Sequence, residues 1–270
     1  DRPRTAVVEL ACTSGIELVG TDETVDPLAT HTRGLGEAIR AALAAGATRL
    51  MLGIGGSVSS DGGAGVLTAL GAVLRDAQGL PVPSGAAGLA RAASFDATQL
   101  IPPPADGVLV LSDVRAPLLG PAGAARVFGP QKGAGPRQVE EIERALARWA
   151  RILGVASDVP GAGAAGGCGF GLLAWGAQLA SGADTVAETI GLDAALVEAG
   201  RVVTVAPNVR PALVGDDPRP VAERAFAAAT LVKLSDEDAE ALYPGMPAEQ
   251  VLETIAALGP QVVVMTRGGE

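Results

Sequence analysis

The segment GIGGSVSSDGGAG, residues 53–65, follows a predicted strand at 49–52 and leads into a predicted helix at 63–74. Glycine has no side chain, so its backbone N–H groups can approach a ligand closely, and a glycine-rich turn from a strand into a helix suits an anion. We therefore expect a phosphate or carboxylate site here. Its candidate ligand-binding residues are Gly55, Gly56, Ser57, Gly62 and Gly63.

Asp61 lies near the end of this segment, at the expected mouth of the site. Its carboxylate is a candidate catalytic group. Alternatively, an aspartate just before a helix accepts hydrogen bonds from backbone N–H groups of the first turn and has a purely structural role. The sequence leaves both interpretations open.

Two further glycine-rich segments follow, FGPQKGA at 128–134 and PGAGAAGG at 160–167. Lys132 in the first of them could neutralise a phosphoryl group during its transfer. The alternative is a solvated lysine in a surface turn. The other candidate anion-binding residues of these segments are Gln131, Gly133, Gly166 and Gly167.

Asp113 comes directly after the predicted strand at 107–111. A carboxylate in that position is suited to binding magnesium or accepting a proton, so Asp113 is a candidate catalytic residue and metal ligand. Its alternative role is to start a turn before Pro117.

The composition narrows the class of protein. The chain has 270 residues, 48% of them hydrophobic, and a formal net charge of −10, which disfavours a nucleic-acid partner because phosphate binding needs clustered cations. Two cysteines and one histidine support neither a disulfide framework nor a zinc site, so we expect a reducing, cytoplasmic environment. The uncharged stretch at 159–183 is rich in glycine, and we expect a buried loop and helix there, not a membrane span.

Strand-like and helical runs alternate along the whole chain, which predicts an α/β fold. The expected strands are 5–11, 49–54, 107–111, 202–206, 231–234 and 261–266. The expected helices are 34–45, 63–74, 136–153, 170–179, 220–228 and 248–258.

The three glycine-rich segments and the sequence between them resemble the bacterial glycerate kinases of the glycerate 2-kinase type, over about residues 5–204. Asp113-Val114 with Pro117-Leu118, and the DPLAT sequence at 26–30, belong to the same resemblance. It implies a two-lobed kinase that transfers a phosphoryl group from ATP to glycerate with Mg²⁺. It further implies that Asp61, Asp113 and Lys132 contribute to catalysis.

The sequence departs from the family pattern at two single positions. Ser60 stands where the family usually has Asn, and Ala116 stands where Asn usually precedes Pro-Leu. The opening lysine-containing segment of the family would precede Asp1, so we expect a glycerate kinase remnant truncated at both ends.

The last quarter of the chain resembles a different family, the ribokinase-like sugar kinases of the fructokinase type. The resemblance rests on PNVRP at 207–211, LVKLSDED at 231–238 and VVMTRG at 263–268. We therefore expect a glycerate kinase-like region at 1–204 and a short βαβαβ ribokinase-like piece at 205–270, joined within 193–206. The acids at 236–238 are expected to cap a helix.

Three functions compete at this stage. The first is ATP-dependent phosphorylation of glycerate, which most of the chain favours. The second is a fructokinase-like sugar kinase, and the third is an inactive fragment that binds a nucleotide or another anion.

Overall fold

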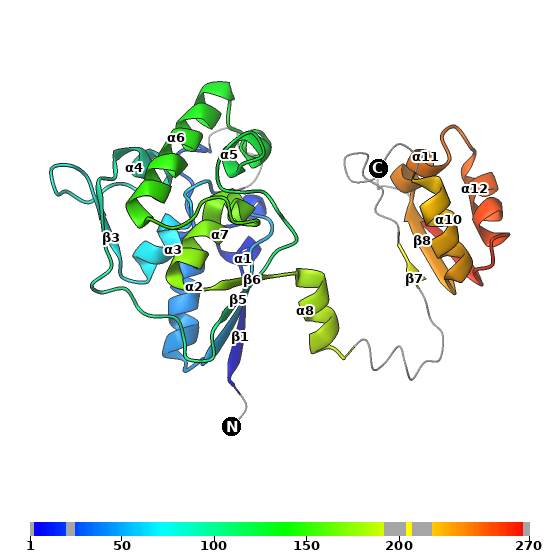
Figure 1. The fold of residues 1–270 in the computed structure, drawn as a ribbon, viewed down its shortest axis with the longest axis horizontal. Coiled ribbons are helices and arrows are strands. Elements are labelled where there is room, and N and C mark those ends of the chain that lie inside the picture. The colour runs from blue at the N-terminus through cyan, green and yellow to red at the C-terminus, as the bar shows by residue number, and fades with distance from the viewer. Residues whose placement is uncertain (1–2, 20–24, 192–203, 207–217, 267–270) are drawn as a thin grey trace. The chain divides into compact units, whose positions relative to one another are not determined.

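The computed structural model describes residues 3–19, 25–191, 204–206 and 218–266. The chain divides into two compact units, Asp1–Val186 and Ala187–Glu270 (Figure 1). The junction expected within 193–206 falls mostly outside the described residues.

The first unit is built on a four-stranded parallel sheet in the order β1-β2-β5-β6. Its strands are β1 (Thr5–Glu9), β2 (Arg49–Gly53), β5 (Val108–Leu111) and β6 (Gln178–Ala180). Alternate residues of the inner strands are buried, as at Leu50 and Leu52. This parallel sheet with helical connections confirms the predicted α/β class.

Helices and short 3-10 turns connect and cover these strands (Figure 1). They are α1 (Ala11–Ser14), η1 (Ile16–Leu18), α2 (Arg33–Ala44), α3 (Ala64–Ala69), α4 (Gly85–Arg91), α5 (Ala124–Phe128), η2 (Pro130–Lys132), α6 (Pro136–Leu153), α7 (Ala164–Trp175) and α8 (Gly182–Thr189). The first unit also contains a two-stranded antiparallel ribbon formed by β3 (Val73–Arg75) and β4 (Ser94–Asp96).

Trp149 of α6 anchors the helical layer to the first glycine-rich segment. Its side chain is fully buried, and its indole N–H donates a hydrogen bond to the carbonyl oxygen of Gly62 at 2.9 Å. The ring of Phe95 meets it edge-on, with 5.4 Å between centroids. This aromatic pair fixes α6 against the backbone of the loop that precedes α3.

Two predicted helices have different limits in the structure. The helix expected at 63–74 ends at Ala69, because Gly71 has a φ of 111° and packs against the carbonyl of Gln99. The residues that follow form β3. In place of the helix expected at 170–179, α7 spans Ala164–Trp175, with left-handed backbone at Ala165, Gly166 and Gly167, and Gln178–Ala180 joins the sheet as β6.

The second unit contains a parallel sheet in the order β7-β8-β9. Its strands are β7 (Thr204–Val205), β8 (Leu231–Ser235) and β9 (Val262–Thr266), and its helices are α10 (Arg219–Ala228), α11 (Asp236–Leu242) and α12 (Ala248–Ala256). A small core centres on Phe226, Val232 and Ile255. The parallel pairing expected for this region is confirmed.

The acids after β8 cap α11, as predicted. Ser235 accepts a hydrogen bond from the backbone N–H of Asp238 at 3.0 Å, and the Asp238 carboxylate accepts one from the backbone N–H of Ser235 at 3.2 Å. This is a reciprocal capping box. No helix among the described residues is long and apolar enough to span a membrane.

Candidate functional site

A cavity of about 560 Å³ lies at the carboxyl ends of β2 and β5. Ligands of parallel α/β sheets commonly bind at this edge. All three glycine-rich segments contribute to its lining: the first through Gly55, Gly56 and Ser57, the second through Gln131 and Lys132, and the third through Ala165. The structure therefore brings together segments that are more than a hundred residues apart in the sequence.

Lys132 lines this cavity but is only 7% exposed. Its ammonium group donates hydrogen bonds to Ser57 Oγ at 3.1 Å and to the carbonyl oxygen of Ser59 at 2.6 Å. Burial lowers the pKa of Lys132 from 10.5 to about 8, although the negative charge of Asp61 acts in the opposite direction. The interpretation of Lys132 as a solvated lysine in a surface turn is therefore wrong.

Ser57 connects the first and third glycine-rich segments at the cavity wall. Its hydroxyl lies 3.2 Å from Ser59 Oγ and 3.4 Å from the carbonyl oxygen of Ala165. Ala165 has a left-handed backbone, with a φ of 54°, which is uncommon for a residue with a side chain. The hydroxyl of Ser57 therefore contacts both the third glycine-rich segment and the ammonium group of Lys132.

Asp113 lies in the cavity lining, two residues beyond β5. Its Oδ1 accepts hydrogen bonds from Ser181 Oγ at 3.2 Å and from the backbone N–H of Gly182 at 3.1 Å. These contacts orient the carboxylate at the sheet edge and tie the end of β5 to the start of α8. Ser112 and Gly182 also line the cavity. Ser112 comes directly after β5, which the strand expected at 107–111 could have indicated, whereas Gly182 follows β6, a strand that the sequence did not predict.

Asp61 is fully buried and does not line the cavity. Its carboxylate accepts hydrogen bonds from the backbone N–H and the hydroxyl of Thr32 and from the backbone N–H groups of Gly63 and Gly65, all within 3.1 Å. Asp61 thus already occupies the N–H groups of the loop and first turn of α3, where an anionic ligand was predicted. In this structure the Asp61 carboxylate binds backbone N–H groups at the start of α3, which is the structural role considered from the sequence.

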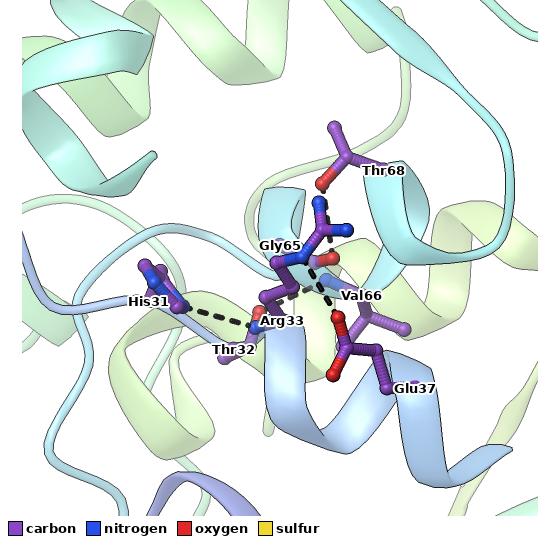
Figure 2. Close-up of polar contacts among 7 residues, drawn as sticks. All are labelled: His31, Thr32, Arg33, Glu37, Gly65, Val66 and Thr68. Carbon is purple, nitrogen blue, oxygen red and sulfur yellow. Dashed lines mark hydrogen bonds and ion pairs between the residues drawn. The ribbon is translucent and has the colours of Figure 1, made fainter. Parts of the chain in front are cut away.

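Thr32, a residue that the sequence did not single out, is the side-chain partner of Asp61. It is fully buried, and its hydroxyl also accepts a hydrogen bond from the backbone N–H of Val66 at 3.1 Å. Figure 2 shows Thr32 beside Val66, and it also shows the ion pair between Arg33 and Glu37 at 2.9 Å, which lies within α2. The hydrogen bonds of Thr32 connect the start of α2 to Asp61 and α3.

Four of the predicted ligand-binding glycines are packing positions. A Cβ at Gly62 would lie 2.6 Å from the Trp149 ring, and one at Gly63 would lie 2.9 Å from Gly171 Cα. A Cβ at Gly166 would lie 2.0 Å from the carbonyl oxygen of Ser59, and one at Gly167 would lie 2.9 Å from Gly62 Cα. Gly166 and Gly167 of the third segment therefore pack on the backbone of the first segment, whereas Gly62 faces α6 and Gly63 faces α7. Gly133 ends the η2 turn instead.

Gly55 and Gly56 differ from these four because both line the cavity. A Cβ at Gly55 would meet no atom within 4 Å, so this glycine leaves open space next to the cavity. Its small size is therefore not required by packing. These two positions retain the close backbone approach that was predicted for a ligand.

The described residues contain no cluster of three or more His, Cys, Asp or Glu side chains that could hold a metal ion by themselves. Asp113 is a single carboxylate in the cavity lining. Mg²⁺ in phosphoryl-transfer sites is commonly bound by one or two carboxylates together with phosphate oxygens and water. The residues present therefore fit a magnesium ion that arrives with a nucleotide, and do not form a metal site of their own.

The sequence pattern that defines the Glycerate kinase family matches residues 1–232. This match extends past residue 204, where the resemblance was expected to end, and nothing in the comparisons supports the sugar-kinase resemblance of the tail. The chain is 43% identical over 208 residues to a glycerate 2-kinase from Escherichia coli K12, and 44% identical over 208 residues to a glycerate kinase from Bacillus subtilis 168.

Both alignments cover 74% of this chain and 54% of the relative, so the chain spans about half the length of the curated relatives it matches. A crystal structure described as a "putative glycerate kinase 2" from Salmonella typhimurium LT2 is 34% identical. It superposes with a TM-score of 0.67 over 99% of this chain and 66% of that chain.

Proposed function

Because the chain belongs to the glycerate kinase family, we propose that it serves in the ATP-dependent phosphorylation of glycerate to phosphoglycerate. The observation that carries this proposal is the cavity at the carboxyl edge of the sheet, where Lys132, Ser57 and the glycines at 55 and 56 meet. A cation, a hydroxyl and closely approachable backbone suit both a carboxylate substrate and a phosphoryl group.

In the proposed reaction, a glycerate hydroxyl attacks the γ-phosphorus of ATP. A new O–P bond forms, the bond to the bridging oxygen of ADP breaks, and the hydroxyl proton passes to a base. Lys132 offsets the negative charge on the phosphoryl oxygens, and its fixed position avoids reorganisation during transfer. The backbone at Gly55 and Gly56 holds the anionic groups of the substrates.

We assign the two aspartates different roles. Asp113 lines the cavity, so it is the candidate for the proton-accepting or metal-binding carboxylate. Mg²⁺, when bound, would screen the charge of the ATP phosphates. Asp61 is a positioning residue, because its buried carboxylate holds the segment that carries Ser57 and stabilises the charged form of Lys132.

An assay of ADP formation also tests the two alternative functions. A fructokinase-like activity rests on the sequence of residues 205–270, whose parallel sheet is common to many α/β proteins. An inactive fragment would bind nucleotide or another anion without turnover. We place the protein in the cytoplasm, on the basis of the free thiols Cys12 and Cys168.

The test is ADP formation by the purified chain with Mg-ATP and either D-glycerate or fructose. We expect ADP formation that depends on glycerate, and we expect Lys132→Ala to lower kcat/KM by about 100-fold or more, the usual effect of removing one group that stabilises transition-state charge. Lys233→Ala is the matched control, since Lys233 is exposed on β8.

Fructose-dependent ADP formation would favour the second candidate. Nucleotide binding without ADP formation would favour the third. An unchanged rate in a folded Lys132→Ala variant would remove this lysine from the proposed site.

A further inference from the structure

A second cavity, of about 580 Å³, lies between α4 and α6, two helices of the first unit that contact each other (Figure 1). None of the described residues lines both this cavity and the one at the sheet edge. Its volume is within the range of roughly 300–1,000 Å³ that is usual for small-molecule sites. The cavity is therefore a candidate site that is separate from the proposed active site.

The floor of this cavity is apolar. It consists of Leu28 and five alanines of α4 and α6. The backbone N–H of Ala87 donates a hydrogen bond to the carbonyl oxygen of Leu28 at 3.0 Å, which holds the segment before α2 on α4. Alanine side chains are short, so the facing helices leave room between them. This floor can contact the carbon atoms of a small organic ligand.

The rim of the cavity is basic. Arg144, Arg148 and Arg151 of α6 line it, and their spacing places them on one face of the helix. Glu141 is the carboxylate of the lining, so the ionisable side chains leave a formal charge of +2 in a protein whose net charge is −10. Like charges three and four residues apart on a helix repel each other, and an anion bound between them would offset this repulsion.

Other acids of α6 make contacts away from this cavity. Glu140 forms an ion pair with Arg126 at 3.0 Å, and Glu143 Oε1 accepts a hydrogen bond from the backbone N–H of Gly120 at 2.7 Å. In the part of the chain that the structure describes, the ion pairs involve other arginines than the three of the rim. The positive charge of the rim is thus open to an external anion.

Two of the rim arginines are held in place by backbone carbonyl groups. One terminal N–H group of Arg148 donates a hydrogen bond to the carbonyl oxygen of Ala92, which follows α4, at 2.8 Å. Arg144 Nε donates one to the carbonyl oxygen of Glu140 at 3.1 Å. A guanidinium group has five N–H donors, so each arginine keeps donors for a ligand. Its planar fork matches two oxygens of a phosphoryl group.

We propose that this cavity binds a small organic molecule that carries a phosphoryl group. A phosphate monoester has a charge of about −1.5 to −2 at neutral pH, which complements the charge of the lining. The guanidinium groups of Arg144 and Arg148 bind the phosphate oxygens, and the carbon part of the ligand contacts the alanine floor. The proposal does not depend on the kinase activity, because the two cavities have different linings.

The experiment is isothermal titration calorimetry of the full chain with phenyl phosphate, which combines a phosphoryl group with an apolar ring. We expect inorganic phosphate and phenol to bind more weakly than phenyl phosphate. The double change Arg144→Gln and Arg148→Gln should weaken binding by about tenfold or more, because it removes hydrogen bonds between charged groups. Arg137→Gln is the matched control and should leave binding unchanged, since Arg137 is exposed on the same helix outside the cavity lining.

Arg144→Gln alone guards against loss of folding in the double variant, because Arg144 is exposed. This single change should also weaken binding. Lys132→Ala separates the two cavities and should leave the binding of phenyl phosphate unchanged. Binding that Lys132→Ala removes, or that persists in full when both rim arginines are replaced, would overturn the proposal. Inorganic phosphate that binds as tightly as phenyl phosphate would overturn the assignment to an organic ligand.

Discussion

At the scale of single residues, Asp61 and Lys132 are two buried ionised groups with opposite consequences. Asp61 receives hydrogen bonds from backbone and side-chain donors on two segments, and these bonds compensate its lost hydration. Burial lowers the pKa of Lys132 to about 8, and its ammonium group donates hydrogen bonds to Ser57 Oγ and the carbonyl oxygen of Ser59 at the cavity wall. The enclosed carboxylate is the structural group, and the lysine is the charged group at the proposed site.

We predict that Asp61→Asn destabilises the first unit by about 2–4 kcal/mol. An amide keeps the shape of the side chain, but its NH₂ group would face backbone N–H donors, and buried bonds to a charged group are each worth about 1.5–3 kcal/mol. The measurement is urea unfolding monitored by tryptophan fluorescence, since Trp149 lies in this core.

Asp113→Asn is the matched control, because the Asp113 carboxylate accepts its bonds at an exposed position. We expect it to unfold within about 0.5 kcal/mol of the unmodified protein, as surface substitutions usually do. Equal destabilisation by the two changes would contradict the structural role given to Asp61.

At the scale of elements, the contact between the first and third glycine-rich segments determines the shape of the cavity. Residues 59–63 pack directly on 166–171 through bare backbone, and the N–H of Gly62 donates a hydrogen bond to the carbonyl oxygen of Gly166 at 3.1 Å. This contact places Ala165 beside Ser57 at the cavity wall. The glycines at this interface therefore shape the site without lining it.

We predict that Gly166→Ala destabilises the protein by roughly 3 kcal/mol or more, because about 1 kcal/mol of left-handed strain adds to an overpacked contact. Gly166 has a φ of 65°, and the added Cβ would lie 2.0 Å from Ser59 O. Gly154→Ala is the control: Gly154 has a φ of 66° at the end of α6, but no atom lies within 4 Å of its Cβ position.

Gly154→Ala should therefore show the strain alone, measured as a shift in the urea midpoint at unchanged slope. Similar losses for the two variants would mean that the loops separate easily. The close packing of the two glycine-rich segments would then not be required for stability.

At the scale of the whole molecule, each compact unit has its own hydrophobic core. The core of the first extends from Leu10 to Ala177, and that of the second is centred on Phe226 and Ile255. The cavity that carries the proposed site is lined entirely by residues of the first unit. A unit with its own core can in general fold alone.

We predict that a chain ending after Gly191 folds cooperatively, with a Tm within a few degrees of that of the full chain. The physical reason is that, among the described residues, those of its main core all lie before this point. Differential scanning calorimetry measures the transition.

A chain ending after Gly163 is the control, since it lacks α7 and β6 and with them Phe170 and Leu172 of the core. It should show no cooperative transition. Loss of the transition in the longer truncation as well would show that the first unit depends on residues 192–270.

The sequence by itself determined the α/β class, most element positions and the segments that meet at the site, because hydrophobic periodicity and glycine clusters are local properties of the chain. The helix limits at Ala69 and Trp175 were missed, since β3 and β6 exist only through pairing with distant strands. Only the tertiary structure decided which glycines line the cavity and which pack, and that Asp61 is enclosed while Lys132 lines the cavity. Burial and hydrogen-bond partners come from segments far apart in sequence, which no local pattern records.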